Sequence, residues 1–203
     1  RRWPSVGALQ TPPHRHTFPA FMDSPPYSFR FKGYSIFLEA SSPGIDTARV
    51  EAELRRALDQ GAVSLMFQPQ FALADDRLGG AEALVRWDQP LLGSIGGEAL
   101  LRIAARADLT TQLTRKVVGA ALKSVLKWPA GLKCSINVTA ADLAVARFPR
   151  EMLDMVGDLA VDPAQITLEI TEQALLGDLD LAARSLGLLR DAGMRIALDD
   201  FGA

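Results

Sequence analysis

Three polar residues recur along the second half of the chain at nearly equal intervals. Asn137, Glu169 and Asp199 each follow a short apolar run and are separated by 32 and 30 residues. Glu82 lies in an earlier apolar run, and Asp200 adds a second carboxylate beside Asp199. Carboxylate and amide oxygens are the ligands that Mg²⁺ and Mn²⁺ prefer, and two such ions can activate water and offset the charge of a phosphate. These residue types therefore indicate a hard-cation site, and zinc is not indicated because no histidine occurs after position 16.

The segments that carry these residues are predicted to be strands of a mostly parallel sheet. The five predicted strands are VSLMFQP (63–69), GGAEALVRW (79–87), LKCSINVT (132–139), QITLEIT (165–171) and MRIALDD (194–200). Helical patterns cover residues 98–107, 109–126, 150–159 and 174–191, and an amphipathic helix at 46–61 precedes the first strand. The polar residues fall about one β-α-β repeat apart, near the carboxyl ends of strands. The pattern therefore favours a TIM-barrel-like α/β fold with its site at that end.

The same pattern suggests how the chain is divided. A complete eight-stranded barrel takes about 250 residues, so residues 45–203 predict an incomplete barrel with about five of the eight strands. Residues 1–44 hold seven of the twelve prolines, and we interpret them as a leader or as the remnant of an upstream module. Within them, YSFRFKGYSIFLEA (27–40) alternates aromatic and polar residues around Gly33, which predicts a short hairpin or an edge strand.

Composition excludes several classes of protein. The chain has a net charge of −2 and is acidic after residue 44, which argues against a DNA- or RNA-binding surface. It contains no apolar run near the roughly 20 residues of a membrane span and no signal-peptide pattern at its start, so we expect a cytoplasmic protein. The single cysteine, Cys134, rules out an internal disulfide and is predicted to be a buried, inert thiol. His14 and His16 lie in the proline-rich start, and we do not interpret them as a metal site.

Four short motifs follow one another along the chain: EALVRW (82–87), INVT (136–139), EITE (169–172) and DDFG (199–202). Together with LRRALDQGAVSLMFQPQFAL (54–73), they closely resemble the EAL-domain family of cyclic di-GMP phosphodiesterases, over about residues 50–203. The resemblance implies a modified eight-stranded β/α barrel that hydrolyses cyclic di-GMP to linear pGpG with Mg²⁺ or Mn²⁺. It also implies that the domain could form a homodimer.

The resemblance implies which residues bind the metal ions. The expected ligands, all oxygen donors, are Glu82, Asn137, Glu169, Asp199 and Asp200. Asp199 would lie between the two ions, and Asp200 would bind the second.

The resemblance also implies contacts around these ligands. Gln68 is expected to contact the substrate, Leu84 to lie near a guanine and Arg86 to contact a phosphate. Glu172 is expected to steady the loop after DDFG, and it joins Glu82, Asp199 and Asp200 as an expected catalytic residue. From the residues alone, Arg86 could instead be a solvated charge, Gln68 a hydrogen-bonded core residue and Glu172 a helix-capping acid.

The sequence departs from the family in a few places. Gln89 stands where the family usually has histidine, and Gly97 stands where proline is common. The family's catalytic lysine, a further metal-binding glutamate and a late glutamine would all fall after Ala203, so we expect the chain as given to be inactive. Two alternatives to an enzyme stay open: a cyclic di-GMP receptor that does not hydrolyse its ligand, and a barrel fragment with no independent function.

Overall fold

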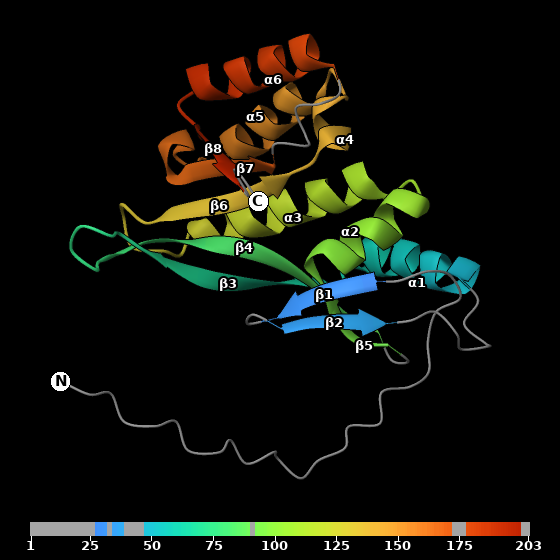
Figure 1. The fold of residues 1–203 in the computed structure, drawn as a ribbon. Coiled ribbons are helices and arrows are strands. Elements are labelled where there is room, and N and C mark those ends of the chain that lie inside the picture. Colours follow the sequence, from blue (N-terminus) through green and yellow to red (C-terminus); the bar gives the residue numbers. More distant parts are fainter. Residues whose placement is uncertain (1–26, 32–33, 39–46, 90–91, 172–177, 200–203) are drawn as a thin grey trace, which may run out of the picture. The chain divides into compact units, whose positions relative to one another are not determined.

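The computed structural model describes residues 27–31, 34–38, 47–89, 92–171 and 178–199 (Figure 1). The chain divides into two units, with the boundary between Ile45 and Asp46. In the first unit, β1 (Tyr27–Phe31) and β2 (Tyr34–Leu38) pair antiparallel, with Tyr27 opposite Leu38. Of the two alternatives for this segment, the hairpin is therefore the one that forms.

The second unit begins with helix α1 (Thr47–Gln60). Val50, Leu54 and Leu58 recur every four residues and are buried on one side of it, as the amphipathic pattern predicts. The helix is followed by Gly61, whose φ of 68° is a left-handed conformation that glycine adopts without steric cost.

All five predicted strands form one sheet, and a sixth, short strand joins it. The strands are β3 (Val63–Phe71), β4 (Leu78–Gln89), β5 (Gly93–Gly96), β6 (Lys133–Val138), β7 (Ile166–Thr171) and β8 (Arg195–Asp199). Their order is β3-β4-β6-β7-β8, and β5 pairs with β4. From β4 to β8 along this order, neighbouring strands run parallel, as predicted.

The first strand pair differs from the parallel prediction, because β3 and β4 run antiparallel. Only residues 72–77 connect them, and a parallel crossover needs a dozen or more residues. The hairpin strand β5, which also runs antiparallel to β4, was not predicted. It is four residues long and glycine-rich, so its sequence has no apolar strand pattern.

Four helices between the strands lie close to their predicted positions: α2 (Gly97–Arg106), α3 (Thr110–Val125), α5 (Phe148–Asp158) and α6 (Leu179–Asp191). Residues 174–177 of the last predicted helix fall outside the described residues. The short helix α4 (Ala140–Leu143) and the 3₁₀ turn η1 (Pro163–Gln165) were not predicted. In Figure 1, α3 runs along β6, and α5 and α6 follow beside β7 and β8. In the described ranges, no helix is both long and apolar enough to cross a membrane.

The strands bury one face and leave the other face polar. On β6, Cys134, Ile136 and Val138 are fully or almost fully buried, whereas the alternate residues are polar. β4 and β7 repeat this pattern with the buried side chains Ala83, Val85, Trp87, Ile166, Leu168 and Ile170. Side chains alternate between the two faces of a strand, so the apolar residues face the helices and the residues between them face the other side of the sheet.

Candidate active site

In addition to Leu84 and Arg86 of β4, five predicted site residues lie on this polar face of the sheet. The register places Gln68 of β3 opposite Glu82 of β4, and Asn137 of β6 opposite Glu169 of β7. Asp199 lies opposite Thr171, two residues beyond Glu169, and therefore on the same face. Directly paired residues of neighbouring strands point to the same side, so the strand register places these five side chains on one face of the sheet.

Glu82 and Asn137 are in direct contact. The Nδ2 amide of Asn137 donates a hydrogen bond to Oε1 of Glu82 at 2.7 Å, between the neighbouring strands β6 and β4. Both side chains are half-buried, which strengthens an amide–carboxylate bond relative to one in water. This geometry leaves the amide oxygen of Asn137 and Oε2 of Glu82 outside the bond.

Glu169 is held by the amide of Gln70, a residue for which the sequence motifs predicted no role. Nε2 of Gln70 donates to Oε1 of Glu169 at 3.1 Å, and Oγ of Ser135 donates to Oε1 of Gln70 at 3.0 Å. The two-residue period of a strand could have predicted that Gln70 is near the site, because Gln70 lies two residues after Gln68 and therefore on the same face of β3.

The predicted substrate-contact residues lie further along β3 and β4. Arg86 is half-buried and donates from Nη1 to the backbone oxygen of Val85 at 2.8 Å. Its guanidinium lies against Gly96, where an added Cβ would be 2.3 Å from Nη1. Leu84 is half-buried, and Gln68 is exposed, which argues against a purely core role for Gln68.

The described residues do not gather three acids around one point. Among them, no group of three or more histidine, cysteine, aspartate or glutamate side chains is close enough to hold a metal ion. Asp199 is exposed at the end of β8. Asp200 and Glu172 fall outside the described residues, so their predicted roles remain predictions.

Cys134 lies on the buried face of β6, as the sequence analysis predicts. Burial, with a smaller effect from the charge of Glu169, raises the pKa of its thiol to about 12. A thiol with this pKa stays protonated at neutral pH, so Cys134 is a poor nucleophile and a poor metal ligand.

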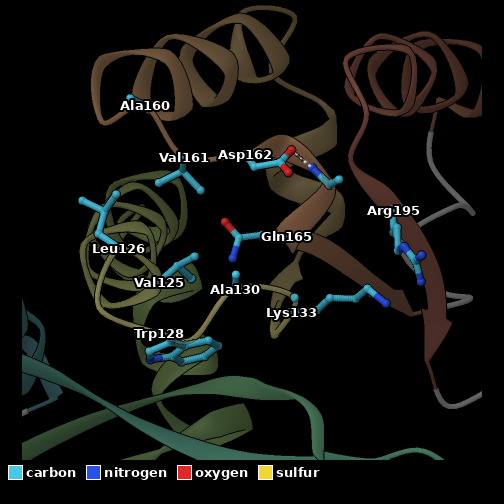
Figure 2. Close-up of a pocket in the computed structure, with 12 residues that line it drawn as sticks. Val125, Leu126, Trp128, Ala130, Lys133, Ala160, Val161, Asp162, Gln165 and Arg195 are labelled. Atoms are coloured by element: carbon cyan, nitrogen blue, oxygen red, sulfur yellow. Dashed lines mark hydrogen bonds between the residues drawn. The ribbon is translucent and has the colours of Figure 1, made fainter.

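A separate pocket of about 460 Å³ lies at the opposite ends of the strands (Figure 2). Its lining includes Lys133 and Arg195, the first residues of β6 and β8, and Gln165, which precedes β7. Trp128 and Asp162 line it as well, and Oδ1 of Asp162 accepts a hydrogen bond from the backbone nitrogen of Ala164 at 2.9 Å. The pocket is therefore at the amino ends of the strands, whereas Asn137, Glu169 and Asp199 lie toward the carboxyl ends, where barrel enzymes carry their active sites.

Comparisons with known proteins agree with this architecture. An uncharacterized protein of Mycobacterium tuberculosis is 34% identical over 158 residues, covering 75% of this chain and 25% of the relative. A cyclic di-GMP phosphodiesterase of Pseudomonas aeruginosa is 33% identical over 141 residues, covering 68% of this chain and 24% of the relative. The chain thus spans about a quarter of the length of these curated relatives.

Solved structures show the same fold. The PaMucR phosphodiesterase, in complex with c-di-GMP, superposes with a TM-score of 0.70 at 26% identity, covering 76% of this chain and 64% of that one. Such neighbours are TIM-barrel-like domains, which confirms the predicted fold class. Their family generally uses divalent metal ions. The sequence model of the EAL domain family matches residues 51–203, and the chain belongs to this family.

Proposed function

We propose that the full-length protein hydrolyses cyclic di-GMP to linear pGpG in the cytoplasm, whereas residues 1–203 alone are expected to be inactive. The observation that carries this proposal is the polar face on which Glu82, Asn137, Glu169 and Asp199 share one side of the sheet. The relative named as a cyclic di-GMP phosphodiesterase and the PaMucR complex with c-di-GMP support this choice of substrate.

The donor set fits two hard divalent cations, either Mg²⁺ or Mn²⁺. Each proposed ligand offers a carboxylate or amide oxygen, and none offers imidazole or thiolate. We propose that five residues would hold these ions: Glu82, Asn137, Glu169, Asp199 and Asp200. When bound, such ions supply an activated water and offset the negative charge of the phosphate.

The substrate contacts follow from the order of side chains along β4. Glu82, Leu84 and Arg86 occupy successive positions on the polar face, about 7 Å apart. An acid, an apolar side chain and a cation therefore follow one another, which suits a ligand whose phosphates lie next to the flat faces of its bases. We propose that Leu84 contacts a guanine and that Arg86 binds a phosphate. The bond to Val85 uses only one of the five N–H donors of Arg86.

Two further roles complete the proposal. Gln68 on β3 lies opposite Glu82, and its side chain is exposed and not packed in the core. We propose that its amide contacts the substrate beside the cations. Glu172 would steady the loop that follows the DDFG motif. Pairing of two copies through this domain stays a prediction.

A receptor that binds cyclic di-GMP without hydrolysing it is the second candidate. The observation that favours it is the lack, among the residues described, of three acids close enough to share a cation. The two candidates differ in one measurable respect, because only the enzyme releases pGpG.

The test is turnover by the full-length protein. The protein is incubated with cyclic di-GMP and Mn²⁺, and pGpG is followed by chromatography. Glu82→Ala should abolish turnover, whereas the control Glu98→Ala should not, because Glu98 is an exposed acid of α2 that pairs with Arg102. Tight binding of cyclic di-GMP with no pGpG would replace the enzyme with the receptor. Near-normal turnover by Glu82→Ala would refute the metal assignment.

A further inference from the structure

Gln70 is a polar residue of the site to which the proposed reaction gives no task. We infer that Gln70, itself held by a hydrogen bond from Ser135, is a positioning residue that holds the carboxylate of Glu169 ready for a cation. The inference rests on the proposed function, because it takes Glu169 as a cation ligand.

The contact between Gln70 and Glu169 crosses the sheet. Gln70 is on β3 and Glu169 is on β7, and both β4 and β6 lie between these strands. The residue opposite Gln70 on β4 is Gly80, which has no side chain to fill the space between them. An added Cβ at Gly80 would lie 2.2 Å from the backbone oxygen of Lys133 on β6, so this close approach of strands requires glycine. The bare backbone of Gly80 thus lets the Gln70 amide reach toward β6 and β7.

The Glu169 carboxylate decides which end of the Gln70 amide faces it, and Ser135 holds the other end. A glutamine amide has an oxygen that accepts and a nitrogen that donates, and the two ends have nearly the same shape. A carboxylate only accepts, so Glu169 takes the amide nitrogen at 3.1 Å. The Ser135 hydroxyl can donate or accept, and it donates to the amide oxygen at 3.0 Å. The opposite orientation would turn the amide oxygen toward a negative charge.

This arrangement fixes one oxygen of Glu169 and leaves the other outside the bond. Oε1 accepts from Gln70, so Oε2 can bind a cation without a change in the orientation of the carboxylate. Partners that hold metal-binding carboxylates in this way typically contribute about 10- to 100-fold to metal affinity. Gln70 donates to Glu169 as Asn137 donates to Glu82, but Gln70 is not itself a proposed ligand.

The test measures Mn²⁺ binding to the full-length protein by calorimetry without substrate, and then the Mn²⁺ dependence of turnover. Gln70→Met keeps the length of the side chain and removes its donor. We expect it to weaken Mn²⁺ binding about 10- to 100-fold and to change kcat at saturating Mn²⁺ much less. The matched control is Gln112→Met, because the Gln112 amide donates to the exposed Asp59, away from the site. This control should bind Mn²⁺ as the wild type does.

A double-mutant cycle tests the role of Ser135. If Ser135 acts only through Gln70, Ser135→Ala weakens Mn²⁺ binding in the wild type and adds nothing in the Gln70→Met background. Fully additive effects would overturn the link. The melting temperature of each metal-free variant separates a positioning effect from unfolding, because positioning predicts weaker Mn²⁺ binding at an unchanged melting temperature.

The outcomes separate this inference from the proposed reaction. If cyclic di-GMP is hydrolysed and Gln70→Met binds Mn²⁺ as tightly as the wild type, the positioning role is wrong and the proposed function stands. If Mn²⁺ binding depends on Gln70 and no pGpG forms, the positioning role stands and hydrolysis is wrong. Absence of Mn²⁺ binding by the wild type would overturn both.

Discussion

The Asn137 amide donates a hydrogen bond of 2.7 Å to the Glu82 carboxylate, although the two residues are 55 positions apart in the chain. The bond joins two residues that the metal proposal requires on neighbouring strands. The donor in this contact is a neutral amide and not an arginine or a lysine.

Replacing the donor with a second acid should separate metal-free stability from metal binding. Asn137→Asp places two carboxylates within contact distance, and like charges in a half-buried site oppose each other. We expect the metal-free variant to lose about 1–3 kcal/mol of stability at pH 7. Added Mn²⁺ should raise its melting temperature by more than it raises that of the wild type, because the cation offsets the added charge.

The control for Asn137→Asp is Gln112→Glu, which brings a carboxylate beside Asp59 at an exposed site. Exposed charge pairs contribute less than about 1 kcal/mol, so this variant should lose little stability and gain nothing from Mn²⁺. If Asn137→Asp melts like the wild type with and without Mn²⁺, Glu82 and residue 137 do not share a cation.

A second prediction concerns the space that Gly96 leaves for Arg86. A Cβ at Gly96 would lie 2.3 Å from Nη1 of Arg86, so Gly96→Ala must displace the guanidinium. The φ of Gly96 is −146°, which alanine also adopts, and the fold should therefore persist. We expect kcat/KM for cyclic di-GMP to fall by up to about 100-fold, mainly through KM, with little change in melting temperature.

Gly119→Ala is the matched control, because nothing lies within 4 Å of the added Cβ in helix α3. It should stabilise the protein by about 0.5–1 kcal/mol and leave KM unchanged. A normal KM in Gly96→Ala would show that the position of Arg86 does not matter for substrate binding.

The sequence predicted the strands and the polar residues near their carboxyl ends because both follow local rules. Short apolar runs between helical patterns predict strands, and the interval between Asn137 and Glu169 predicts neighbouring parallel strands. The polar residues near the carboxyl ends of β6 and β7, Asn137 and Glu169, were therefore predictable. The closing contact of Gln70 with Glu169 was not, because it joins residues 99 positions apart and depends on the strand order.

The departure at Gln89 also has an explanation that only the structure provides. Gln89 is buried at the end of β4, where its Nε2 donates to Oε2 of Glu53 on α1 at 2.6 Å. Its Oε1 accepts from the backbone nitrogen of Leu92. The hydrogen bond from Gln89, followed by that from Arg49, lowers the pKa of Glu53. The sequence predicts a polar residue there but not its partner, since α1 and β4 meet only through tertiary packing.

A third prediction uses the single cysteine. Because the pKa of Cys134 is raised to about 12 and its side chain is fully buried, a maleimide reagent should not label the native protein at pH 7.5. Labelling should reach one thiol per chain in denaturant. Ser94→Cys provides the control, since Ser94 is exposed on β5 and its thiol should react in the native state. Rapid labelling of native wild type would mean that β6 is not covered by helices.

The last prediction concerns Asp142, which lies in the short helix α4 and is 0% exposed. Its Oδ2 accepts from the Thr114 hydroxyl at 2.9 Å and from the backbone nitrogen of Thr139 at 3.0 Å, whereas its Oδ1 has no hydrogen-bond partner among the described residues. Burial opposes the charged form more than these bonds favour it, so the pKa of Asp142 is raised.

A raised pKa means that the folded state binds this proton more tightly than the unfolded state does. Asp142 therefore reduces stability as pH rises above about 3.9, the ordinary value for aspartate, and this cost is absent at lower pH. Asp142→Asn keeps an oxygen for Thr114 and Thr139 and cannot ionise. When urea denaturation is repeated at rising pH from pH 4, we expect the free energy of unfolding of the variant, relative to the wild type, to increase. The increase should level off once the pH exceeds the raised pKa of Asp142. Asp154→Asn, at an exposed position of α5, controls for the loss of one negative charge. A wild type that gains stability over Asp142→Asn with rising pH would mean that the threonine bonds outweigh burial and that Asp142 is held as an anion.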